Sequence, residues 1–405
     1  MLLIYNLFLR IYLILILISS FFNKKAKKWL QGRRETNVIH CNSSFWFHFA
    51  SLGEFEQGRP VLEKLRQLHP NQIIVITFFS PSGYEVRKNT PLANYVYYLS
   101  LDSAKNARQF IDNINPTLAV FTKYEYWYHY FNELNKRRIP LYVISGIFRP
   151  RQVFFKWYGG LHRKILTFVT LFFVQDAESE ALLKTIGITH VTVSGDTRFD
   201  RVWENSQAPK QIAVVEQFKA GNPIFMAGST WPQDEELIIS LVKQYPEWKF
   251  IFAPHEISEH KIQALLKLLP QDKAIRFSEI NETTKLANYQ SLIIDNIGML
   301  SSLYQYGDIA FIGGGFGAGI HNILEAAAFG LPVIFGPRYQ KFKEARDVVE
   351  KQLGFSVMNE EELKAVADIL IPDKAYRDEV GAEIKAYVKA NTGATQKFLE
   401  VIKTS

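Results

Sequence analysis

Short apolar runs alternate with amphipathic stretches along most of the chain. In the first half, residues 59–68, 103–114 and 178–186 have the periodicity of helices with one buried face. Between them, seven runs rich in β-branched and aromatic residues predict strands. These runs are 45–49, 73–78, 95–99, 118–122, 141–144, 171–174 and 191–193. The alternation predicts an α/β fold with an open, mostly parallel sheet.

The same alternation resumes after a polar stretch. Residues 201–222 carry polar side chains, a proline and no clear strand pattern, which predicts a boundary between two domains. Further strands are predicted at 223–227, 250–252, 291–294, 309–312 and 332–335. From residue 360 the chain is predicted to be mostly helical, with helices over 376–391 and 395–402. We therefore expect two α/β halves of similar size.

The first 22 residues have a different pattern. Arg10 is their only charged side chain, and residues 11–18 are almost wholly aliphatic. As a helix the segment would extend roughly 33 Å, enough to cross a bilayer. The uninterrupted apolar run is short, so a helix lying in the membrane interface is also open, and the alternative to both is a buried helix. We expect residues 1–22 to be a membrane anchor.

Basic residues are concentrated directly after this segment. They are Lys24, Lys25, Lys27, Lys28, Arg33 and Arg34, within a chain of formal net charge +7. Positive charge on this side predicts that the rest of the chain stays on the cytoplasmic face. It also favours anionic lipid as a partner over nucleic acid, because no aromatic-basic pattern of a nucleic-acid-binding module is present.

Cysteine and acidic residues limit the chemistry of the chain. Cys41 is the only cysteine, which excludes an internal disulfide and a cysteine-based metal cluster. There is no Asp-x-Asp pair, and no His or carboxylate cluster has metal-ligand spacing. We therefore expect no metal-clamped diphosphate.

A glycine-rich stretch, residues 313–319, stands between a predicted strand and an alanine-rich segment. Backbone N–H groups at a helix start, with a partial positive charge of about half a unit, predict a phosphate site there. Residues 313–318 also satisfy a loose dinucleotide fingerprint, but no acidic residue follows about 20 positions on. As alternatives, Asn322 and Glu325 would form a variant of a capping box, and the glycines would serve tight turns.

Polar side chains follow several predicted strands, where ligands of open α/β sheets bind. Glu54 follows the first strand and could act as a general base, or could simply favour the N-terminus of the next helix. Glu125 and Arg198 follow two other strands of the first half. Trp231 and His255 follow strands of the second half, with base stacking and phosphate binding as functional interpretations and ordinary packing or an inert surface position as alternatives.

In this order the motifs resemble the Kdo transferases, membrane-associated glycosyltransferases that add deoxy-octulosonic acid (Kdo) to lipid A precursors. The resemblance runs from the apolar segment to about residue 350. It rests on an SxGE element at 51–54, a TPTG-like turn at 80–83, an ExW element at 125–127, a G-x-x-[KR]-F-D element at 195–200, a GST element at 228–230 and an HNxLEA element at 321–326.

The resemblance implies a GT-B fold, in which two Rossmann-like domains face a cleft. It implies an acceptor domain over 36–205, a CMP-sugar domain over 221–385 and a helix over 386–405 that packs back on the first domain. The implied reaction moves Kdo from CMP-Kdo to lipid IVA with inversion, at the cytoplasmic face of the inner membrane. No metal and no cofactor are implied, since CMP-Kdo is the donor substrate.

The resemblance also implies roles for individual residues. Glu54 would be the general base, and Glu125 and Arg198 would support the transition state. Glu325 would contact the ribose hydroxyls of the donor. The implied donor-binding residues are Pro254, His255, Ile297, Gly298, Met299, Asn322, Ile323, Leu324 and Glu325.

Four positions depart from the family pattern. Lys123 replaces a glutamate, Trp231 a histidine, His255 an arginine, and residues 145–147 an Asn-Ala-Arg triplet. These departures bear most on contacts with the donor phosphate. Two other functions therefore stay open: a GT-B transferase that uses a UDP-sugar, and a membrane-tethered nucleotide-sugar-binding protein without catalysis.

Overall fold

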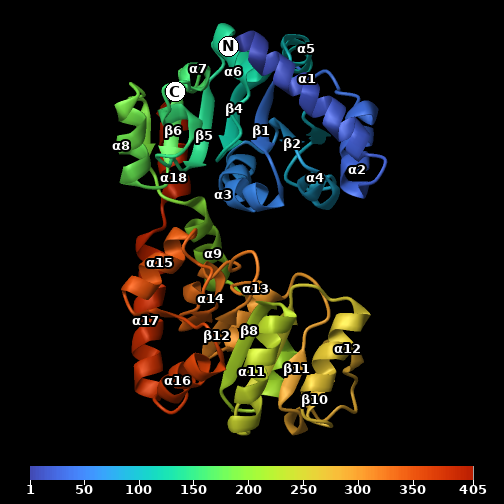
Figure 1. The fold of residues 1–405 in the computed structure, drawn as a ribbon, viewed down its shortest axis with the longest axis vertical. Helices are drawn as coiled ribbons and strands as arrows, with labels where there is room; N and C mark the ends of the chain where they lie inside the picture. Colours follow the sequence, from blue (N-terminus) through green and yellow to red (C-terminus); the bar gives the residue numbers. More distant parts are fainter. Residues whose placement is uncertain (405) are drawn as a thin grey trace. The chain divides into compact units, whose positions relative to one another are not determined.

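The computed structural model of this chain describes residues 1–404, which form two compact α/β units. Unit 1 comprises residues 1–201 together with the residues from 391 onward, and unit 2 comprises Val202–Ala390. Figure 1 labels the elements of both units. The predicted fold class, with two parallel-sheet α/β domains, is confirmed.

Unit 1 is built around a parallel sheet with the strand order β3-β2-β1-β4-β5-β6-β7. Its strands are β1 (Ser44–Phe49), β2 (Ile73–Phe78), β3 (Tyr95–Tyr98), β4 (Pro116–Thr122), β5 (Leu141–Gly146), β6 (Leu171–Val174) and β7 (Val191–Val193). Its helices are α1 (Leu2–Ser19), α2 (Lys24–Glu35), α3 (Leu52–Leu68), α4 (Pro81–Arg87), α5 (Ala104–Ile114), α6 (Tyr128–Lys136), the 3₁₀ turn η1 (Val153–Phe155), α7 (Gly160–Leu166), α8 (Ala177–Thr185) and α18 (Ala394–Thr404).

The central strand β1 sets the geometry of this sheet. Phe47 pairs with Ile76 of β2 on one side and with Val120 of β4 on the other, both in parallel. From β1 the chain adds β2 and β3 at one side, and then returns to add β4 to β7 at the other. The direction of strand addition reverses between β1 and β4, and ligands of such sheets bind at that point.

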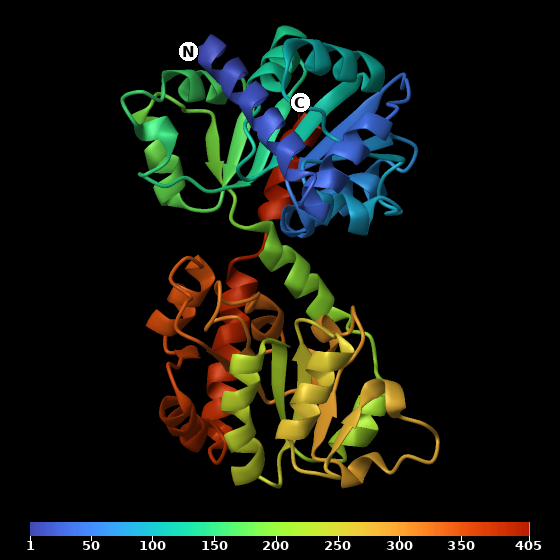
Figure 2. The ribbon, with the colours of Figure 1, turned by 45° about the vertical axis from the view of Figure 1, so that its right-hand side comes forward.

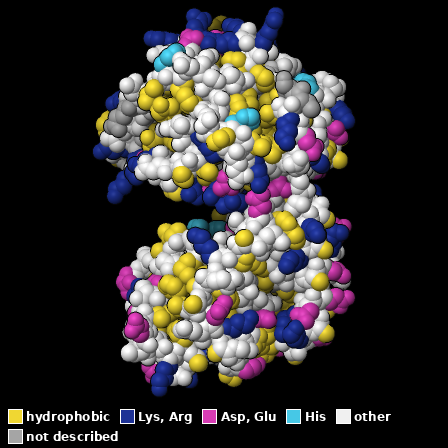
Figure 3. Space-filling view, turned by 180° about the vertical axis from the view of Figure 1, so that it is seen from behind, with side chains coloured by type: hydrophobic (Ala, Val, Ile, Leu, Met, Phe, Trp, Pro, Cys, Tyr) yellow, Lys and Arg dark blue, Asp and Glu magenta, His cyan; other side chains and the backbone are white. Residues whose placement is uncertain are grey.

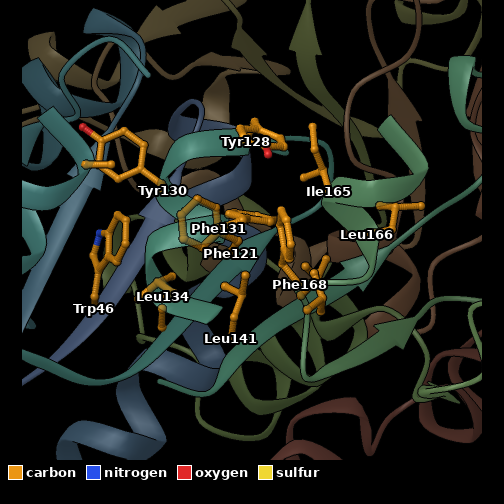
Figure 4. Close-up of a cluster of buried hydrophobic side chains, with 14 of the residues drawn as sticks. Trp46, Phe121, Tyr128, Tyr130, Phe131, Leu134, Leu141, Ile165, Leu166 and Phe168 are labelled. Atoms are coloured by element: carbon orange, nitrogen blue, oxygen red, sulfur yellow. The ribbon is translucent and has the colours of Figure 1, made fainter. Parts of the chain in front are cut away.

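Successive strand residues of unit 1 pack on opposite faces of the sheet, as the pleat requires. On one face, Trp46, Phe121 and Val143 join residues of α5, α6 and α7 in a large aromatic cluster (Figure 4). On the other face, Phe47, Val120 and Tyr142 pack with residues of α3 and α18.

The C-terminal helix α18 is part of unit 1. Its Phe398 ring lies 5.1 Å from the ring of Phe173 and 5.7 Å from that of Tyr142. The backbone N–H groups of Gly393 and Thr395 donate to the Asp200 carboxylate at 2.6 and 2.7 Å. The chain therefore returns to the first unit after completing the second.

Helix α1 lies along the body of unit 1 in both views of the ribbon (Figures 1 and 2). The Tyr5 hydroxyl donates to the Asp102 carboxylate at 2.6 Å, and Asn6 Oδ1 lies 2.7 Å from His129 Nε2. Among residues 1–404, α1 is the one helix whose length and composition would allow it to cross a membrane. Polar contacts therefore fix one face of α1 on the unit, while most of its apolar side chains stay exposed.

Unit 2 repeats the architecture with the strand order β10-β11-β9-β8-β12-β13-β14, again all parallel. Its strands are β8 (Ile224–Thr230), β9 (Lys249–Pro254), β10 (Ala274–Arg276), β11 (Ser291–Ile293), β12 (Ile309–Ile312), β13 (Val333–Phe335) and β14 (Gly354–Ser356). Its helices are α10 (Ala213–Lys219), α11 (Pro232–Gln244), α12 (Glu259–Leu268), η2 (Phe277–Glu279), η3 (Leu286–Asn288), α13 (Leu300–Leu303), η4 (Tyr304–Tyr306), α14 (Leu324–Ala328), α15 (Lys343–Glu350), α16 (Glu360–Leu370) and α17 (Lys374–Ala390). Strand addition reverses between β8 and β12.

Two strands were not anticipated from the sequence, and the predicted domain boundary contains helices. All twelve predicted strands are present, but β10 and β14, with three residues each, complete the two edges of the second sheet. The stretch expected to be a plain boundary contains most of α9 (Thr197–Gln207) and all of α10. Its polar composition reflects helices that expose much of their surface.

Candidate active site

Glu54 lies in the first turn of α3, directly after β1. Its carboxylate accepts a hydrogen bond from the Ala50 N–H at 2.5 Å. Burial raises the pKa of Glu54 to about 7, and the negative charge of Glu125 adds to this, while the Ala50 N–H and Lys123 oppose it. A carboxylate whose pKa lies near neutral pH is suited to accept a proton during catalysis.

Glu125 follows β4 and is held by two ring N–H groups. His48 Nε2 lies 2.7 Å from Glu125 Oε2, and the Trp127 indole N–H donates to the same oxygen at 3.1 Å. On the other side of the imidazole, His48 Nδ1 lies 2.8 Å from the hydroxyl of Thr77, which accepts the indole N–H of Trp46 at 2.8 Å. One placement of protons satisfies all these groups: Thr77 donates to His48 Nδ1, and His48 Nε2–H donates to Glu125.

Arg198 follows β7 and is fixed by its neighbour Asp196. The Asp196 carboxylate accepts the backbone N–H of Arg198 at 2.9 Å and its guanidinium at 2.9 and 2.8 Å, and it also accepts the side-chain amide of Gln57 at 2.7 Å. Burial alone would raise the pKa of Asp196, but Arg198 and Lys123 hold it below its usual value. Arg198 is therefore a cation with a fixed orientation.

The three predicted catalytic residues lie at one edge of the sheet of unit 1. Glu54 follows β1, Glu125 follows β4 and Arg198 follows β7, and all these strands run in the same direction. The strands β1 and β4 are neighbours, and the electrostatic effect of Glu125 on Glu54 agrees with their closeness. The two carboxylates thus flank the point where strand addition reverses, where a ligand is expected.

Two departures from the family pattern belong to the same edge. Lys123 and Ser145, at the ends of β4 and β5, have left-handed backbone conformations with φ of 61° and 52°. Residues other than glycine seldom adopt this conformation, and it is enriched at functional sites. The Ser145 hydroxyl lies 2.8 Å from that of Thr197, beside the Asp196–Arg198 pair.

Sequence reasoning missed His48 and Thr77. Both lie inside strands that were read only as apolar runs, and both are fully buried. A histidine in the middle of an otherwise aromatic strand was the available signal, because a buried imidazole needs partners for its nitrogens.

In unit 2, three side chains from the segments that follow three strands form a stack. The Trp231 and His255 rings lie 4.9 Å apart at 27°, and the His255 and His321 rings lie 4.3 Å apart at 21°. The Trp231 indole N–H donates to His321 Nε2 at 3.2 Å. Burial, together with nearby His255, lowers the pKa of His321 to about 4, so this ring is neutral and can accept the bond. Trp231 and His255, which depart from the family pattern, therefore contact His321, which matches that pattern.

The glycine-rich loop follows β12 and packs against neighbouring backbone. A side chain at Gly313 would bring its Cβ within 2.6 Å of Thr230 Cα, and one at Gly315 would come within 2.6 Å of Gly336 Cα. The N–H of Gly314, whose φ is 93°, donates to the Asp234 carboxylate at 2.9 Å. Close packing therefore explains Gly313 and Gly315, and the positive φ explains Gly314.

The helix expected after this loop is short. Helix α14 has five residues, so its dipole supplies less charge to an anion than the sequence pattern suggested. Asn322 Oδ1 accepts the Leu324 N–H at 3.2 Å, but its side-chain amide donates to Glu325 at 3.2 Å. The N-cap of α14 is Ile323, so Asn322 and Glu325 do not occupy the two positions of a capping box.

The other implied donor-binding residues lie on loops at the same edge of unit 2. Pro254 ends β9, and Ile297, Gly298 and Met299 lie between β11 and α13, with Ile297 well exposed. Ile323 and Leu324, in contrast, are fully buried in unit 2. These two residues could contact a ligand only through their backbone.

Solved structures identify the fold first. UDP-GlcNAc 2-epimerase from Neisseria meningitidis superposes with a TM-score of 0.61 and 14% identity, covering 89% of this chain and 100% of that chain. The glycotransferase of kitacinnamycin superposes with a TM-score of 0.52 and 11% identity, covering 90% of this chain and 99% of that one. At these identities the likeness concerns the fold alone, which is the GT-B fold of glycosyltransferases and related epimerases.

Sequence comparisons then show which family the chain resembles. Residues 22–201 match the family model described as 3-deoxy-D-manno-octulosonic-acid transferase (kdotransferase). The 3-deoxy-D-manno-octulosonic acid transferase of Haemophilus influenzae is 26% identical over 400 residues, covering 94% of this chain and 92% of that protein. The transferase of the same name from Aquifex aeolicus is 28% identical over 335 residues, covering 81% of this chain and 86% of that protein. These matches confirm the predicted resemblance to the Kdo transferases.

Proposed function

We propose that this protein transfers Kdo from CMP-Kdo to lipid IVA, a lipid A precursor, in lipopolysaccharide biosynthesis. The observation that carries the proposal is the pair Glu54 and Glu125 at the point of strand reversal, within the segment that matches the family model. A pKa of about 7 leaves Glu54 largely ionised in slightly alkaline solution and able to accept a proton.

In the proposed reaction, Glu54 accepts the proton of the acceptor hydroxyl. The acceptor oxygen forms a bond to the anomeric carbon of Kdo, the bond from that carbon to the phosphate oxygen breaks, and CMP leaves. A single displacement of this kind inverts the anomeric centre. The Ala50 N–H supports the step by fixing the orientation of the carboxylate. General base catalysis typically contributes about 10² to 10⁴ in rate.

We assign the support of the transition state to Glu125 and Arg198. Asp196 holds the Arg198 guanidinium in place, so this cation can face the sugar carboxylate or the phosphate without reorganising. His48 and Trp127 hold Glu125 in the same way, so that it can accept a hydrogen bond from a sugar hydroxyl.

The donor nucleotide is assigned to unit 2, where polar loops follow β8, β9, β11 and β12. The stack of Trp231, His255 and His321 offers an aromatic surface, and Glu325 is placed on the ribose hydroxyls. The donor carries a single phosphate and a sugar carboxylate, which one cation and backbone N–H groups can neutralise. We therefore propose that transfer needs neither a divalent metal nor a cofactor.

We further propose that the protein is bound to the cytoplasmic face of the inner membrane through α1. Apolar side chains of this helix, such as Leu3, Leu7 and Leu15, are exposed, and the basic helix α2 follows. Because Tyr5 and Asn6 bind the body of unit 1, an orientation in the plane of the interface is favoured over a span. Alkaline extraction of membranes tests the orientation, since it releases interfacial proteins and leaves spanning ones in the pellet.

The proposed reaction is tested by mass spectrometry of the acceptor. CMP-Kdo is first produced from CTP and Kdo by its synthetase, divalent metal is then chelated, and purified protein and lipid IVA are added. The expected product is lipid IVA heavier by one or more Kdo residues. Unmodified lipid would contradict the proposal, and turnover of a UDP-sugar under the same conditions would favour the alternative GT-B transferase.

A further inference from the structure

An apolar groove of about 820 Å³ lies in unit 1 between α1 and the residues that lead into α7. It is lined by a face of α1 that includes Ile4 and Phe8, by Tyr126 and Trp127, and by residues 157–162. None of the lining side chains is Asp, Glu, Lys or Arg, and burial lowers the pKa of His162, which keeps that ring neutral. The volume is in the range of about 300–1,000 Å³ that is typical of small-molecule sites.

One lining residue connects this groove to the proposed catalytic carboxylates. Trp127 forms part of the groove, and its indole N–H donates to Glu125 at 3.1 Å. Glu125 in turn raises the pKa of Glu54 through its charge. One part of the groove is therefore a single side chain away from the site where the acceptor hydroxyl is deprotonated.

Another part of the groove is open and rich in exposed aromatic surface. The side chain of Trp157 is 90% exposed, and Tyr158 beside it is more than half exposed. Exposed Trp and Tyr are typical of protein surfaces that meet the boundary between water and lipid. Figure 3 shows clusters of apolar side chains on one face of unit 1, with Lys and Arg side chains around the outline of that unit.

We propose that this groove binds an acyl chain of the lipid acceptor and thereby holds the acceptor's sugar headgroup beside Glu54 and Glu125. The proposal rests on the proposed function for the identity of the acceptor. An acyl chain is favoured as the occupant because the lining is apolar, the open part is next to the exposed face of α1, and the far part meets the carboxylates. The same arrangement explains why α1 is fixed on the unit, since it forms one wall.

The preference of the enzyme for acylated over deacylated acceptor measures the binding of the acyl chain. Each methylene removed from water contributes roughly fourfold in affinity. We therefore expect kcat/KM for lipid IVA to exceed that for its fully deacylated form by at least about tenfold, and to fall as the acyl chains are shortened. Equal kcat/KM values for the two acceptors would overturn the proposal.

Gly160 offers a position at which the groove can be filled. The atoms nearest to a Cβ there belong to Met1, at 3.8 Å, and to Arg163, at 3.9 Å, which are ordinary contacts. Gly160→Phe is expected to bring the ratio of kcat/KM for the acylated acceptor to kcat/KM for the deacylated acceptor close to one. Lys164→Phe adds the same ring at an exposed position of the same helix and is expected to keep the wild-type ratio. A Gly160→Phe ratio equal to that of the wild type would overturn the proposal.

A measurement without turnover separates this proposal from the proposed function. The probe is a lysophospholipid with a photoreactive group on its acyl chain, and the labelled peptides are mapped by mass spectrometry. Labelling at α1 and residues 157–162 that is lost in Gly160→Phe supports acyl-chain binding even if the wild type transfers no Kdo. Labelling that is scattered, or that persists in Gly160→Phe, overturns it. A third outcome is labelling of the groove by the probe together with equal kcat/KM values for acylated and deacylated acceptors. This outcome would assign the groove to membrane lipid, and it would overturn the proposal that the groove binds the acceptor.

Discussion

The imidazole of His48 and the indole of Trp127 contact the same carboxylate oxygen, Oε2 of Glu125, at 2.7 and 3.1 Å. His48 belongs to β1 and Trp127 follows β4, so the two neighbouring strands at the point of reversal together fix one carboxylate. Trp127 also lines the apolar groove. In the proposed mechanism, Trp127 and Glu125 therefore connect the acceptor groove to the catalytic carboxylates.

His48 is expected to act as a positioning residue for Glu125. His48→Phe removes the donor to Glu125, and losing one hydrogen bond to a charged group is expected to lower kcat by about 10- to 100-fold. Steady-state kinetics should show little change in KM, because the substrate does not contact His48 in the proposed site. His48→Gln can still donate an N–H and should recover part of the loss. Equal kcat values for His48→Phe and the wild type would contradict this role.

The pH dependence of transfer is expected to follow Glu54. As a general base Glu54 acts in its ionised form, and burial raises its pKa to about 7 from an ordinary 4.5. The value of kcat/KM should therefore rise with pH through about 7 and level off above it. A pH profile of initial rates checks this, and a flat profile from pH 5.5 to 8 would exclude Glu54 as the base.

Because its pKa is raised, ionised Glu54 lowers the free energy of unfolding at neutral and alkaline pH. The unfolded chain releases this proton near pH 4.5 and the folded chain near 7, so wild-type stability falls as the pH rises between these values. Glu54→Gln removes the charge and can still accept the Ala50 N–H. Urea unfolding should find the variant more stable at pH 8, on the order of 1–3 kcal/mol, with the difference vanishing near pH 4. An equal difference at both pH values would contradict the assignment of this charge.

The aromatic stack of unit 2 is expected to support donor binding. Trp231→Ala removes the ring that contacts both His255 and His321, and an aromatic pair of this kind contributes about 0.5–1.5 kcal/mol. Calorimetric titration with CMP should show a Kd raised about threefold to tenfold. Trp203→Ala, at a half-buried tryptophan of the same unit, serves as the control and should bind CMP as the wild type does. Unchanged CMP affinity in Trp231→Ala would remove the stack from the donor site.

The sequence was sufficient for most of the fold because the strands that it predicts are buried runs bounded by turns. It failed at β10 and β14, where three residues at a sheet edge are too few for a pattern. It also failed to separate α9 and α10 from a plain linker, because short exposed helices share the composition of loops.

The sequence predicts Glu54, Glu125 and Arg198 as site residues because each follows a strand. His48 and Thr77 were missed because their role arises from a pairing between neighbouring strands, which residue order does not reveal. The contact of Trp231 with His255 and His321 likewise joins three loops that are far apart in the chain. The sequence predicts α1 as an apolar helix. Its attachment to unit 1 depends on Tyr5 and Asn6, two side chains with polar groups within this helix.

The most direct test of the central claim is mass spectrometry of lipid IVA after incubation with CMP-Kdo and either the wild type, Glu54→Gln or Glu56→Gln. Glu56 lies on the same helix and pairs with Arg59 and Arg87, so its variant controls for the loss of a nearby carboxylate. We predict Kdo-bearing lipid with the wild type and Glu56→Gln, and a rate lowered by about 10² to 10⁴ with Glu54→Gln, which still binds CMP. Unmodified lipid with the wild type, or full transfer by Glu54→Gln, would contradict the account.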